Sequence, residues 1–409
     1  MMRPETLERP PGSAMSEPVR NLRVHFYGVQ GSGSVFPSRS ERQALYELND
    51  RELLARVLDD LERFTDSQGT IRCTAEEILG EARSTKALLA YRNRLQPPEP
   101  RVYGGWTTCV RLETADGYDI VLDCGSGFRN CARDLQASWG ARARRELHLF
   151  GSHSHLDHTE GFDQAAVCFD PRNTIRVYGN RQFLRGLDQN LGVFSHQVAE
   201  EVLGVQTPIF YGIMPATFAA CEIRDLASDP PPDSGGPWAA ACHDLHTPLR
   251  LGATTVSMVE VFHPAPCLAY RIERGGASFL FCTDHELLHA DDGGDPRLAP
   301  SRAAEERLIA AAQGVDLMYR DAQYFRTEYD GLQGISSGGG LPRVGWGHSC
   351  IEDVLEMAQS CGVKRTLVGH HDPNRDWSER NWVDNALARL SDQTGLELAL
   401  AQAETTIEL

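Results

Sequence analysis

Short apolar runs recur along the chain, and five of them lead within three residues into a histidine or an aspartate. Short runs rich in Val, Leu, Ile and Phe predict strands buried in a sheet. The five are Val121-Leu122 before Asp123, Leu147-His148-Leu149-Phe150 before His153, Val259-Glu260-Val261-Phe262 before His263, Phe279-Leu280-Phe281-Cys282 before Asp284, and Thr366-Leu367-Val368-Gly369 before His370. The pattern therefore predicts strands that end beside side chains able to bind a metal ion.

Helical spacing of apolar residues marks three other stretches. The first covers residues 41–64, the second covers 75–95 ahead of Pro97 and Pro98, and the third covers 351–361. The first stretch carries Leu45, Leu53, Leu54, Val57, Leu58 and Leu61 at this spacing. We therefore predict a helical insertion over residues 37–100 that docks against the domain; a lid over the site and a dimer arm are the alternatives.

A second insertion is predicted over residues 180–252, where the stretch 228–237 is too rich in Pro and Gly to hold a helix or a central strand. Long loops of this kind commonly shape access to a site. The candidate ligands spread from residue 153 to residue 370 and must converge, so residues 21–409 are predicted to form one catalytic domain. Residues 1–20 are expected to form a disordered tail.

The densest candidate chemistry lies in Ser152-His153-Ser154-His155-Leu156-Asp157-His158. Side chains alternate faces in an extended segment, so His153 and His155 point the same way and can hold one ion. A turn at Leu156 would direct Asp157 and His158 toward a second ion. Imidazoles with an added carboxylate suit zinc and similar divalent ions in a site that keeps one position open for water.

This run resembles the His-x-His-x-Asp-His motif of the metallo-β-lactamase fold, and segments over residues 22–36 and 101–400 resemble the same family. The resemblance implies an α/β fold of the αββα sandwich type, with Asp123 orienting the motif. It implies two divalent ions, zinc first, with manganese or iron(II) as alternatives, and a bridging water or hydroxide as nucleophile. The implied ligands are His153, His155 and His263 on one ion, Asp157, His158 and His370 on the other, and Asp284 shared by both.

The segment Gly345-Trp346-Gly347-His348-Ser349 stands before the third predicted helix and resembles the His-Ser-Thr segment of the phosphodiesterase branch, with Cys350 in place of Thr. That branch includes ribonuclease Z and the phosphoribosyl cyclic phosphodiesterases. The resemblance implies that His348 contacts the scissile phosphate, so Asp157 and His348 are the expected catalytic residues. Ser349 is the expected helix N-cap, and the competing interpretation is that His348 only caps the helix.

The expected function is hydrolysis of a phosphodiester in a small cyclic nucleotide or cyclic phosphate. A thioesterase or lactonase, a ribonuclease Z-like RNA 3′-processing endonuclease, and a non-enzymatic sensor on the same fold remain alternatives. The chain departs from the family at Trp106, where Asn is common, and at Thr283-Asp284-His285, where Gly-Asp-Thr is common. His285 would then lie next to the bridging carboxylate and affect the choice of substrate.

The charge and the cysteine content indicate which partners and which cellular compartment to expect. The net charge of −17 opposes binding of long nucleic acid, so a small-molecule phosphodiester is the expected partner. The sequence does not decide between a monomer and a homodimer. The eleven cysteines form no Cys-x-x-Cys pair, residues 1–18 lack the apolar centre of a signal peptide, and no apolar stretch is long enough to span a membrane. We expect a cytoplasmic protein in which Cys124, Cys267 and Cys282 are core residues.

Overall fold

The computed structural model describes residues 21–97, 101–140, 142, 144–202, 209–228, 241–289 and 294–409. The tail predicted over residues 1–20 lies outside the described residues, as does most of the turn-rich stretch 228–237.

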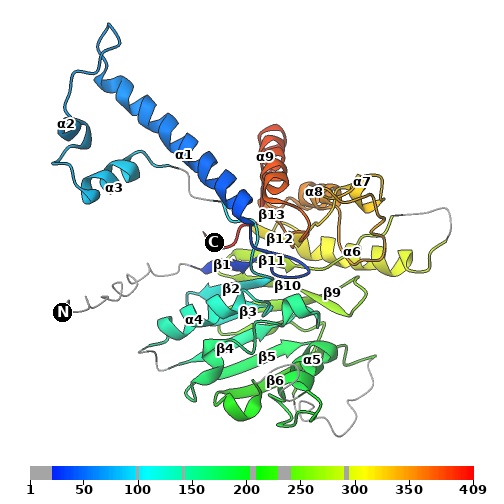
Figure 1. The fold of residues 1–409 in the computed structure, drawn as a ribbon. Helices are drawn as coiled ribbons and strands as arrows, with labels where there is room; N and C mark the ends of the chain where they lie inside the picture. The colour runs from blue at the N-terminus through cyan, green and yellow to red at the C-terminus, as the bar shows by residue number, and fades with distance from the viewer. Residues whose placement is uncertain are drawn as a thin grey trace.

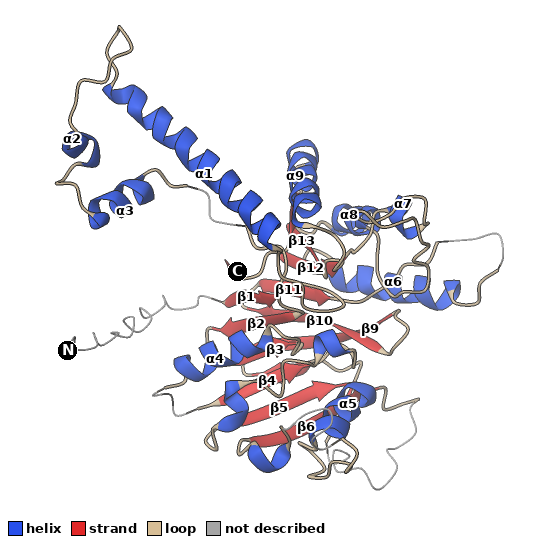
Figure 2. Cartoon of the chain, viewed as in Figure 1, coloured by secondary structure: helices blue, strands red, loops and turns tan. Residues whose placement is uncertain are grey.

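Two β-sheets form the body of the molecule (Figure 2). In spatial order the first sheet holds β15 (Thr405–Glu408), β1 (Leu22–Gly28), β2 (Cys109–Thr114), β3 (Asp119–Leu122), β4 (Glu146–Phe150), β5 (Thr174–Gly179), β6 (Thr217–Arg224) and β7 (Cys242–Asp244). The second holds β14 (Glu397–Leu400), β13 (Arg365–Gly369), β12 (Leu317–Asp321), β11 (Ala277–Cys282), β10 (Cys267–Arg274), β9 (Thr254–Val261) and β8 (Leu249–Leu251).

The apolar faces of the two sheets pack against each other. Side chains from both sheets meet in one buried cluster, which includes Phe26 and Phe150 from the first sheet and Phe281 and Tyr319 from the second. The rings of Phe281 and Tyr319 stack with their centroids 5.3 Å apart. Burial of this apolar area from two sheets is the main favourable contribution to folding.

Helices cover the outer faces of both sheets (Figure 1). Over the first sheet lie α4 (Phe128–Ser138) and α5 (Arg181–Leu191), and over the second lie α6 (Leu298–Ala312), α8 (Ile351–Cys361) and α9 (Trp377–Thr394). The short helices are α7 (Arg326–Tyr329), η1 (Glu62–Phe64), η2 (Leu156–His158), η3 (Ala166–Phe169) and η4 (Tyr211–Ile213). The layers follow the order helix, sheet, sheet, helix, so the αββα sandwich expected from the sequence is confirmed. Among the described helices, none is long and apolar enough to cross a membrane.

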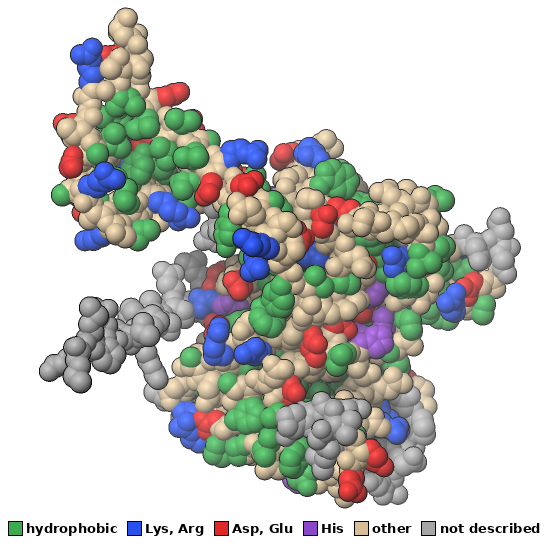
Figure 3. All heavy atoms as spheres, viewed as in Figure 1, with side chains coloured by type: hydrophobic (Ala, Val, Ile, Leu, Met, Phe, Trp, Pro, Cys, Tyr) green, Lys and Arg blue, Asp and Glu red, His purple; other side chains and the backbone are tan. Residues whose placement is uncertain are grey.

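The described part of the insertion over residues 37–100, which is residues 37–97, forms an arm that projects from the body (Figures 1 and 3). Its long helix α1 (Arg39–Leu61) begins with a capping box at Ser38 and buries none of its residues. The single helix predicted over 75–95 is wrong, because Gly80 at φ 82° ends α2 (Ala75–Leu79) and Ser84 caps a new helix, α3 (Thr85–Arg94).

The expectation that the insertion docks against the domain is wrong for most of α1. Its first turn contacts the body, where Glu41 Oε1 accepts from the Trp377 amide of α9 at 3.1 Å. Toward its other end it contacts α3 instead: the Tyr91 hydroxyl donates to Asp60 Oδ2 at 3.1 Å, and Arg56 donates to the carbonyl of Leu95 at 3.2 Å. Leu54 and Leu58 remain 61% and 65% exposed. An apolar stripe predicts that a helix packs on something, and here much of the stripe stays open to solvent.

Candidate metal centre

The seven predicted metal ligands meet at one edge of the sandwich, where strands of both sheets end. His153 and His155 follow β4, and the turn η2 (Leu156–His158) then brings Asp157 and His158 to the same place. His263 follows β9, Asp284 follows β11, and His370 follows β13. The strand ends of an open α/β sheet commonly carry binding residues. In Figure 3 histidine side chains reach the surface between the two halves of the body.

Three imidazoles form the first group. The ring centroid of His153 lies 4.5 Å from that of His155 and 4.7 Å from that of His263. The Nε2 atom of His263 is 3.3 Å from Nδ1 of His155. Asp284 Oδ2 faces the group, 3.5 Å from His153 Nε2 and 3.8 Å from His263 Nε2. Each of these four residues can therefore present one ligand atom to a common point.

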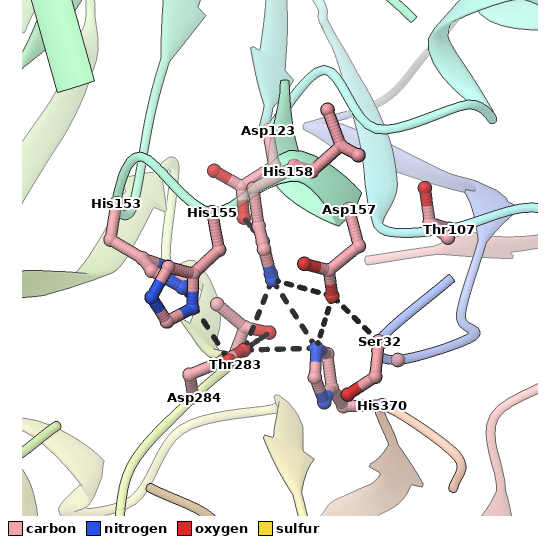
Figure 4. A network of polar contacts seen from close by, with 12 residues as sticks. Ser32, Thr107, Asp123, His153, His155, Asp157, His158, Thr283, Asp284 and His370 are labelled. Atoms are coloured by element: carbon pink, nitrogen blue, oxygen red, sulfur yellow. Dashed lines mark hydrogen bonds and ion pairs between the residues drawn. The ribbon is translucent and has the colours of Figure 1, made fainter. Parts of the chain in front are cut away.

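The second group holds Asp157, His158 and His370 (Figure 4). The Nε2 atoms of the two histidines are 3.2 Å apart, and Asp157 Oδ2 lies 3.3 Å from that of His158 and 3.2 Å from that of His370. Asp284 Oδ1 lies 3.2 Å from His158 Nε2 and 3.0 Å from His370 Nε2. Asp284 thus turns one oxygen toward each group, a geometry in which one carboxylate can bridge two ions.

These residues fit two divalent cations. His153 Nε2 is buried and has no hydrogen-bond partner among the described residues, although a buried polar atom normally has one. The two Nε2 atoms of the second group face each other and a carboxylate, an arrangement that a cation between them would satisfy. Imidazole nitrogens with aspartate oxygens are ligands that zinc accepts.

Asp123 orients this arrangement from behind. Its carboxylate accepts hydrogen bonds from the amide of Ser152 at 2.6 Å and the hydroxyl of Ser152 at 2.7 Å, and lies 2.7 Å from His158 Nδ1. Asp123 has a φ of 59°, which aspartate tolerates better than most residues. A proton on His158 Nδ1 leaves the Nε2 lone pair free for a metal ion.

Three further residues hold ligands in place, and sequence reasoning assigned none of them this role. The side-chain amide of Gln323 lies 2.7 Å from His370 Nδ1, the Gly347 carbonyl lies 3.1 Å from His263 Nδ1, and the Ser32 amide donates to Asp157 Oδ2 at 2.8 Å. Gly31 packs so closely that a Cβ there would stand 2.4 Å from His370 Nδ1. Ser32, Gly31, Gln323 and Gly347 all lie in segments that resemble the family, and this resemblance was the sequence signal that could have identified them.

The two groups differ in charge. Burial lowers the pKa of His263 to about 4, so the first group favours neutral imidazoles. In the second group burial acts against charge, but Asp284 and Asp157 outweigh it and raise the pKa of His370 to about 10. The pKa of His158 is likewise raised, and the pKa of Asp157 is lowered. The carboxylates therefore make the second group more negatively charged than the first, and a cation bound there is stabilised more strongly.

His348 lies beside both groups. Its ring stacks on that of His370 with centroids 5.0 Å apart, and its Nδ1 atom lies 3.1 Å from Asp321 Oδ2 and 3.9 Å from Asp284 Oδ2. Burial alone would lower the pKa of His348, but the carboxylate of Asp321 raises it above its ordinary value. A protonated imidazole oriented in this way can donate a proton.

The N-cap predicted for the helix after His348 is wrong. The cap of α8 is Cys350, whose side chain makes no capping hydrogen bond. The Ser349 hydroxyl instead donates to the carbonyl of His285 at 2.5 Å. A tertiary partner therefore takes the group that the local pattern assigned to the helix end.

His285 does not face the metal ligands, although it follows Asp284 directly. Its Nδ1 atom accepts from the amide of Phe262 at 3.0 Å, and its Nε2 atom lies 2.8 Å from Glu305 Oε2. Glu305 also pairs with the buried guanidinium of Arg320 at 2.8 Å. The suggestion that His285 affects substrate choice at the bridging carboxylate therefore has no support from its position.

A third cluster, formed by His289, Cys350 and Asp353, also has its ligand atoms close together. Arg326 already donates to Asp353 Oδ1 at 2.6 Å, and His289 lies 3.1 Å from the other oxygen of that carboxylate. A guanidinium on the only carboxylate of the cluster competes with a metal ion. We interpret this cluster as a partly buried ion-pair network.

A family model and related sequences match this chain. The sequence model of the beta-lactamase superfamily domain matches residues 118–371, a span that contains all seven candidate ligands. A ribonuclease Z of Porphyromonas gingivalis (strain ATCC 33277) is 22% identical over 262 residues, which cover 61% of this chain and 78% of the relative.

Among solved structures, a diphosphatase from the PhnP family is similar with a TM-score of 0.49 and 14% identity, over 96% of this chain and 98% of that one. The short form of human tRNase Z is similar with a TM-score of 0.45 and 13% identity, over 94% and 98% of the two chains. The family match covers more than half of the sequence and coincides with the four-layer sandwich, so this chain belongs to the beta-lactamase superfamily of metal-dependent hydrolases.

Proposed function

We propose that this protein is a dinuclear-metal-dependent phosphodiesterase whose substrate is a small cyclic nucleotide or cyclic phosphate. The observation that carries the proposal is the His348–Asp321 pair beside the shared carboxylate Asp284. Expulsion of a thiolate from a thioester needs no such acid, whereas departure of an alkoxide from phosphorus is assisted by one. A lactone also releases an alkoxide, so direct assay rather than His348 distinguishes a lactonase.

When bound, two divalent ions supply a water nucleophile of lowered pKa and offset the charge of the phosphoryl oxygens. His348 acts on the leaving oxygen rather than on the nucleophile. Asp321 holds its Nδ1 proton, and within the described residues its Nε2 atom makes no hydrogen bond. Nε2 is therefore available to donate a proton to the leaving oxygen. The stacking of His348 on His370 fixes the direction of that proton.

The surroundings of the site support a small substrate. Six of the seven ligands are buried, while His155 is exposed and the neighbouring Leu156 is 70% exposed. Substrate therefore approaches from the His155 side. The net charge of −17 disfavours long polyanions, whose binding depends on clustered Lys and Arg.

A substrate panel tests the proposal. Purified protein loaded with zinc or manganese is assayed against cyclic mononucleotides, cyclic dinucleotides, a generic aryl phosphodiester, a thioester and a lactone. We expect turnover of at least one phosphodiester and none of the carbonyl substrates. Turnover of the thioester or lactone alone would replace the proposal with the carbonyl-hydrolase alternative.

A ribonuclease Z-like RNA endonuclease is the second candidate, and the similarity to the ribonuclease Z of Porphyromonas gingivalis favours it. The acidic charge opposes it. The discriminating assay uses precursor tRNA with a 3′ extension beside the small diesters. Cleavage of the precursor at the 3′ end, with no turnover of cyclic substrates, would favour the second candidate.

A further inference from the structure

Glu286 is a fully buried carboxylate, two residues after the shared ligand Asp284, that the proposed chemistry does not use. Within the described residues it makes no ion pair with Arg, Lys or His. Three neutral donors approach it instead: the Tyr329 hydroxyl reaches Oε1 at 2.6 Å, the Gly345 amide reaches Oε1 at 2.6 Å, and the Gly347 amide reaches Oε2 at 2.7 Å. Hydrogen bonds to a carboxylate at these lengths are charge-assisted and stronger than neutral ones.

The two backbone amides belong to the loop that delivers His348. Gly345 and Gly347 flank Trp346, and His348 is the next residue. Both glycines have positive φ, 85° and 93°, so the loop has a conformation that other residues adopt only with strain. Glu286 is therefore the group that holds this unusual turn from inside.

The same loop also contacts the first metal group. The Gly347 carbonyl lies 3.1 Å from His263 Nδ1, and a Cβ on Gly347 would stand 2.0 Å from that nitrogen. A carbonyl at Nδ1 selects the proton there and leaves Nε2 of His263 for the metal. One peptide group thus links the position of His348 to the orientation of a metal ligand.

The backbone of Glu286 is itself fixed on both sides. Its amide donates to the carbonyl of Phe262 at 2.9 Å, directly before His263, and its carbonyl accepts from the Ser301 hydroxyl of α6 at 2.8 Å. Ser301 Oγ also accepts from the Leu288 amide at 2.8 Å. The carboxylate is therefore a fixed point between Asp284, the end of β9 and the His348 loop.

We infer that Glu286 is a positioning residue for the reaction: its carboxylate sets the Gly345–Gly347 turn and thereby places both His348 and the metal-facing nitrogen of His263. The inference rests on the proposed function for the role of His348, but its effect on His263 concerns metal binding alone. Glu286 touches neither substrate nor metal in this role, because all its short contacts are made with the three donors.

A matched pair of variants tests the inference. Glu286→Gln keeps size and shape, but whichever way the amide turns, its NH₂ group opposes the amide of Gly345 or that of Gly347. Tyr329→Phe removes one donor to Glu286 and leaves both loop amides bonded. Tyr329→Phe deletes one hydrogen bond of the same carboxylate and leaves no donor unsatisfied, whereas Glu286→Gln leaves one buried loop amide facing another donor, so its thermal stability is expected to fall further.

We expect Glu286→Gln to lower kcat on a phosphodiester by roughly 10- to 100-fold with KM within about twofold, since a displaced acid affects the transition state more than binding. Its affinity for the more weakly held zinc ion, measured by competition with a chromogenic chelator, should fall by roughly 10- to 100-fold, as for other groups that orient metal ligands. Tyr329→Phe should keep both values within about twofold of the parent.

Parental kcat and zinc affinity in Glu286→Gln would overturn the inference. Equal losses of kcat in both variants would also overturn it, because that result points to general destabilisation. If Glu286→Gln does not fold, Glu286→Asp keeps the charge but shortens the reach, and parental kcat and zinc affinity there have the same meaning. If the parent hydrolyses no phosphodiester, the proposed function fails, and unchanged zinc affinity in Glu286→Gln then decides against the positioning role separately.

Discussion

The pair formed by His348 and Asp321 makes the sharpest kinetic prediction. His348→Ala removes the side chain whose Nδ1 atom lies 3.1 Å from Asp321 Oδ2 and whose ring stacks on His370. Loss of a positioned general acid typically lowers the rate by about 10² to 10⁴, which corresponds to roughly 3 to 5 kcal/mol of transition-state stabilisation. Since His348 is not among the seven candidate ligands, the variant should keep its metal ions.

Asp321→Asn separates the charge of the pair from its geometry. Asp321 Oδ2 faces three donors, His348 Nδ1 and the amides of His285 and Ser349, so an asparagine oxygen is expected to occupy this position. The NH₂ group then takes the place of Oδ1, a buried atom with no hydrogen-bond partner. The hydrogen bond to Nδ1 survives, but the negative charge that raises the pKa of His348 is lost.

The sign of the pH effect follows. A general acid works while protonated, so activity falls as the pH rises through its pKa. Lowering the pKa of His348 by Asp321→Asn should move the basic limb of the kcat profile to lower pH. Replacing this charge-assisted hydrogen bond, worth about 1.5 to 3 kcal/mol, by a neutral one, worth about 0.5 to 1.5 kcal/mol, should reduce kcat roughly 10-fold at neutral pH.

The assay is steady-state hydrolysis of the best phosphodiester from pH 5 to about pH 10, a range that brackets ordinary histidine pKa values, with metal content measured on the same samples. His289→Ala is the matched control, because it removes another histidine whose side chain is 36% exposed and pairs with Asp353. Parental kcat in His348→Ala at unchanged metal content would refute the assignment of His348 as the general acid.

Three further predictions follow from other parts of the molecule. Asp123→Ala should lower zinc affinity and kcat by roughly 10- to 100-fold in chelator competition and kinetics, because His158 loses the group that orients it. Glu305→Gln should lower the free energy of unfolding in urea by about 3 to 5 kcal/mol, because it leaves the buried Arg320 charge unpaired. Burial opposes ionisation of Glu305, but Arg320 lowers its pKa to about 2. The contribution of the ionised Glu305 carboxylate to the free energy of unfolding should therefore be complete above the ordinary carboxyl pKa of about 4.5 and be lost as the pH falls toward 2. Replacing residues 37–100 by a short Gly/Ser bridge should leave a folded, metal-binding core with altered substrate preference or an altered oligomeric state by light scattering, because α1 buries none of its residues. A soluble deletion with the parent's substrate preference and number of subunits would contradict a lid and a dimer arm alike.

The ligand-bearing segments could be predicted because their signals are local. His153, His155, Asp157 and His158 lie in one short motif, and His263, Asp284 and His370 each follow an apolar run that forms a strand. Strand ends of one sheet share an edge, so local patterns brought together the ligands of each sheet, and the family resemblance predicted that the two sets meet in one site.

The remaining features depend on partners far away in the sequence. Glu286 meets its three donors at separations of 43, 59 and 61 residues, and no spacing rule reaches that far. Ser349 has a cap residue's chemistry but bonds to His285, 64 residues away. The apolar stripe of α1 predicted a packed face, yet the stripe does not say whether α3, the domain or solvent lies opposite.

The central claim is that seven side chains hold two metal ions that share Asp284. The most direct test is elemental analysis of the purified protein, combined with zinc or manganese titration of protein stripped by a chelator. The account predicts about two equivalents per chain, and lower content with lower activity in Asp284→Ala, since its two oxygens face different groups. A protein that carries no transition metal, takes up none on titration and gains no activity from it would contradict the account.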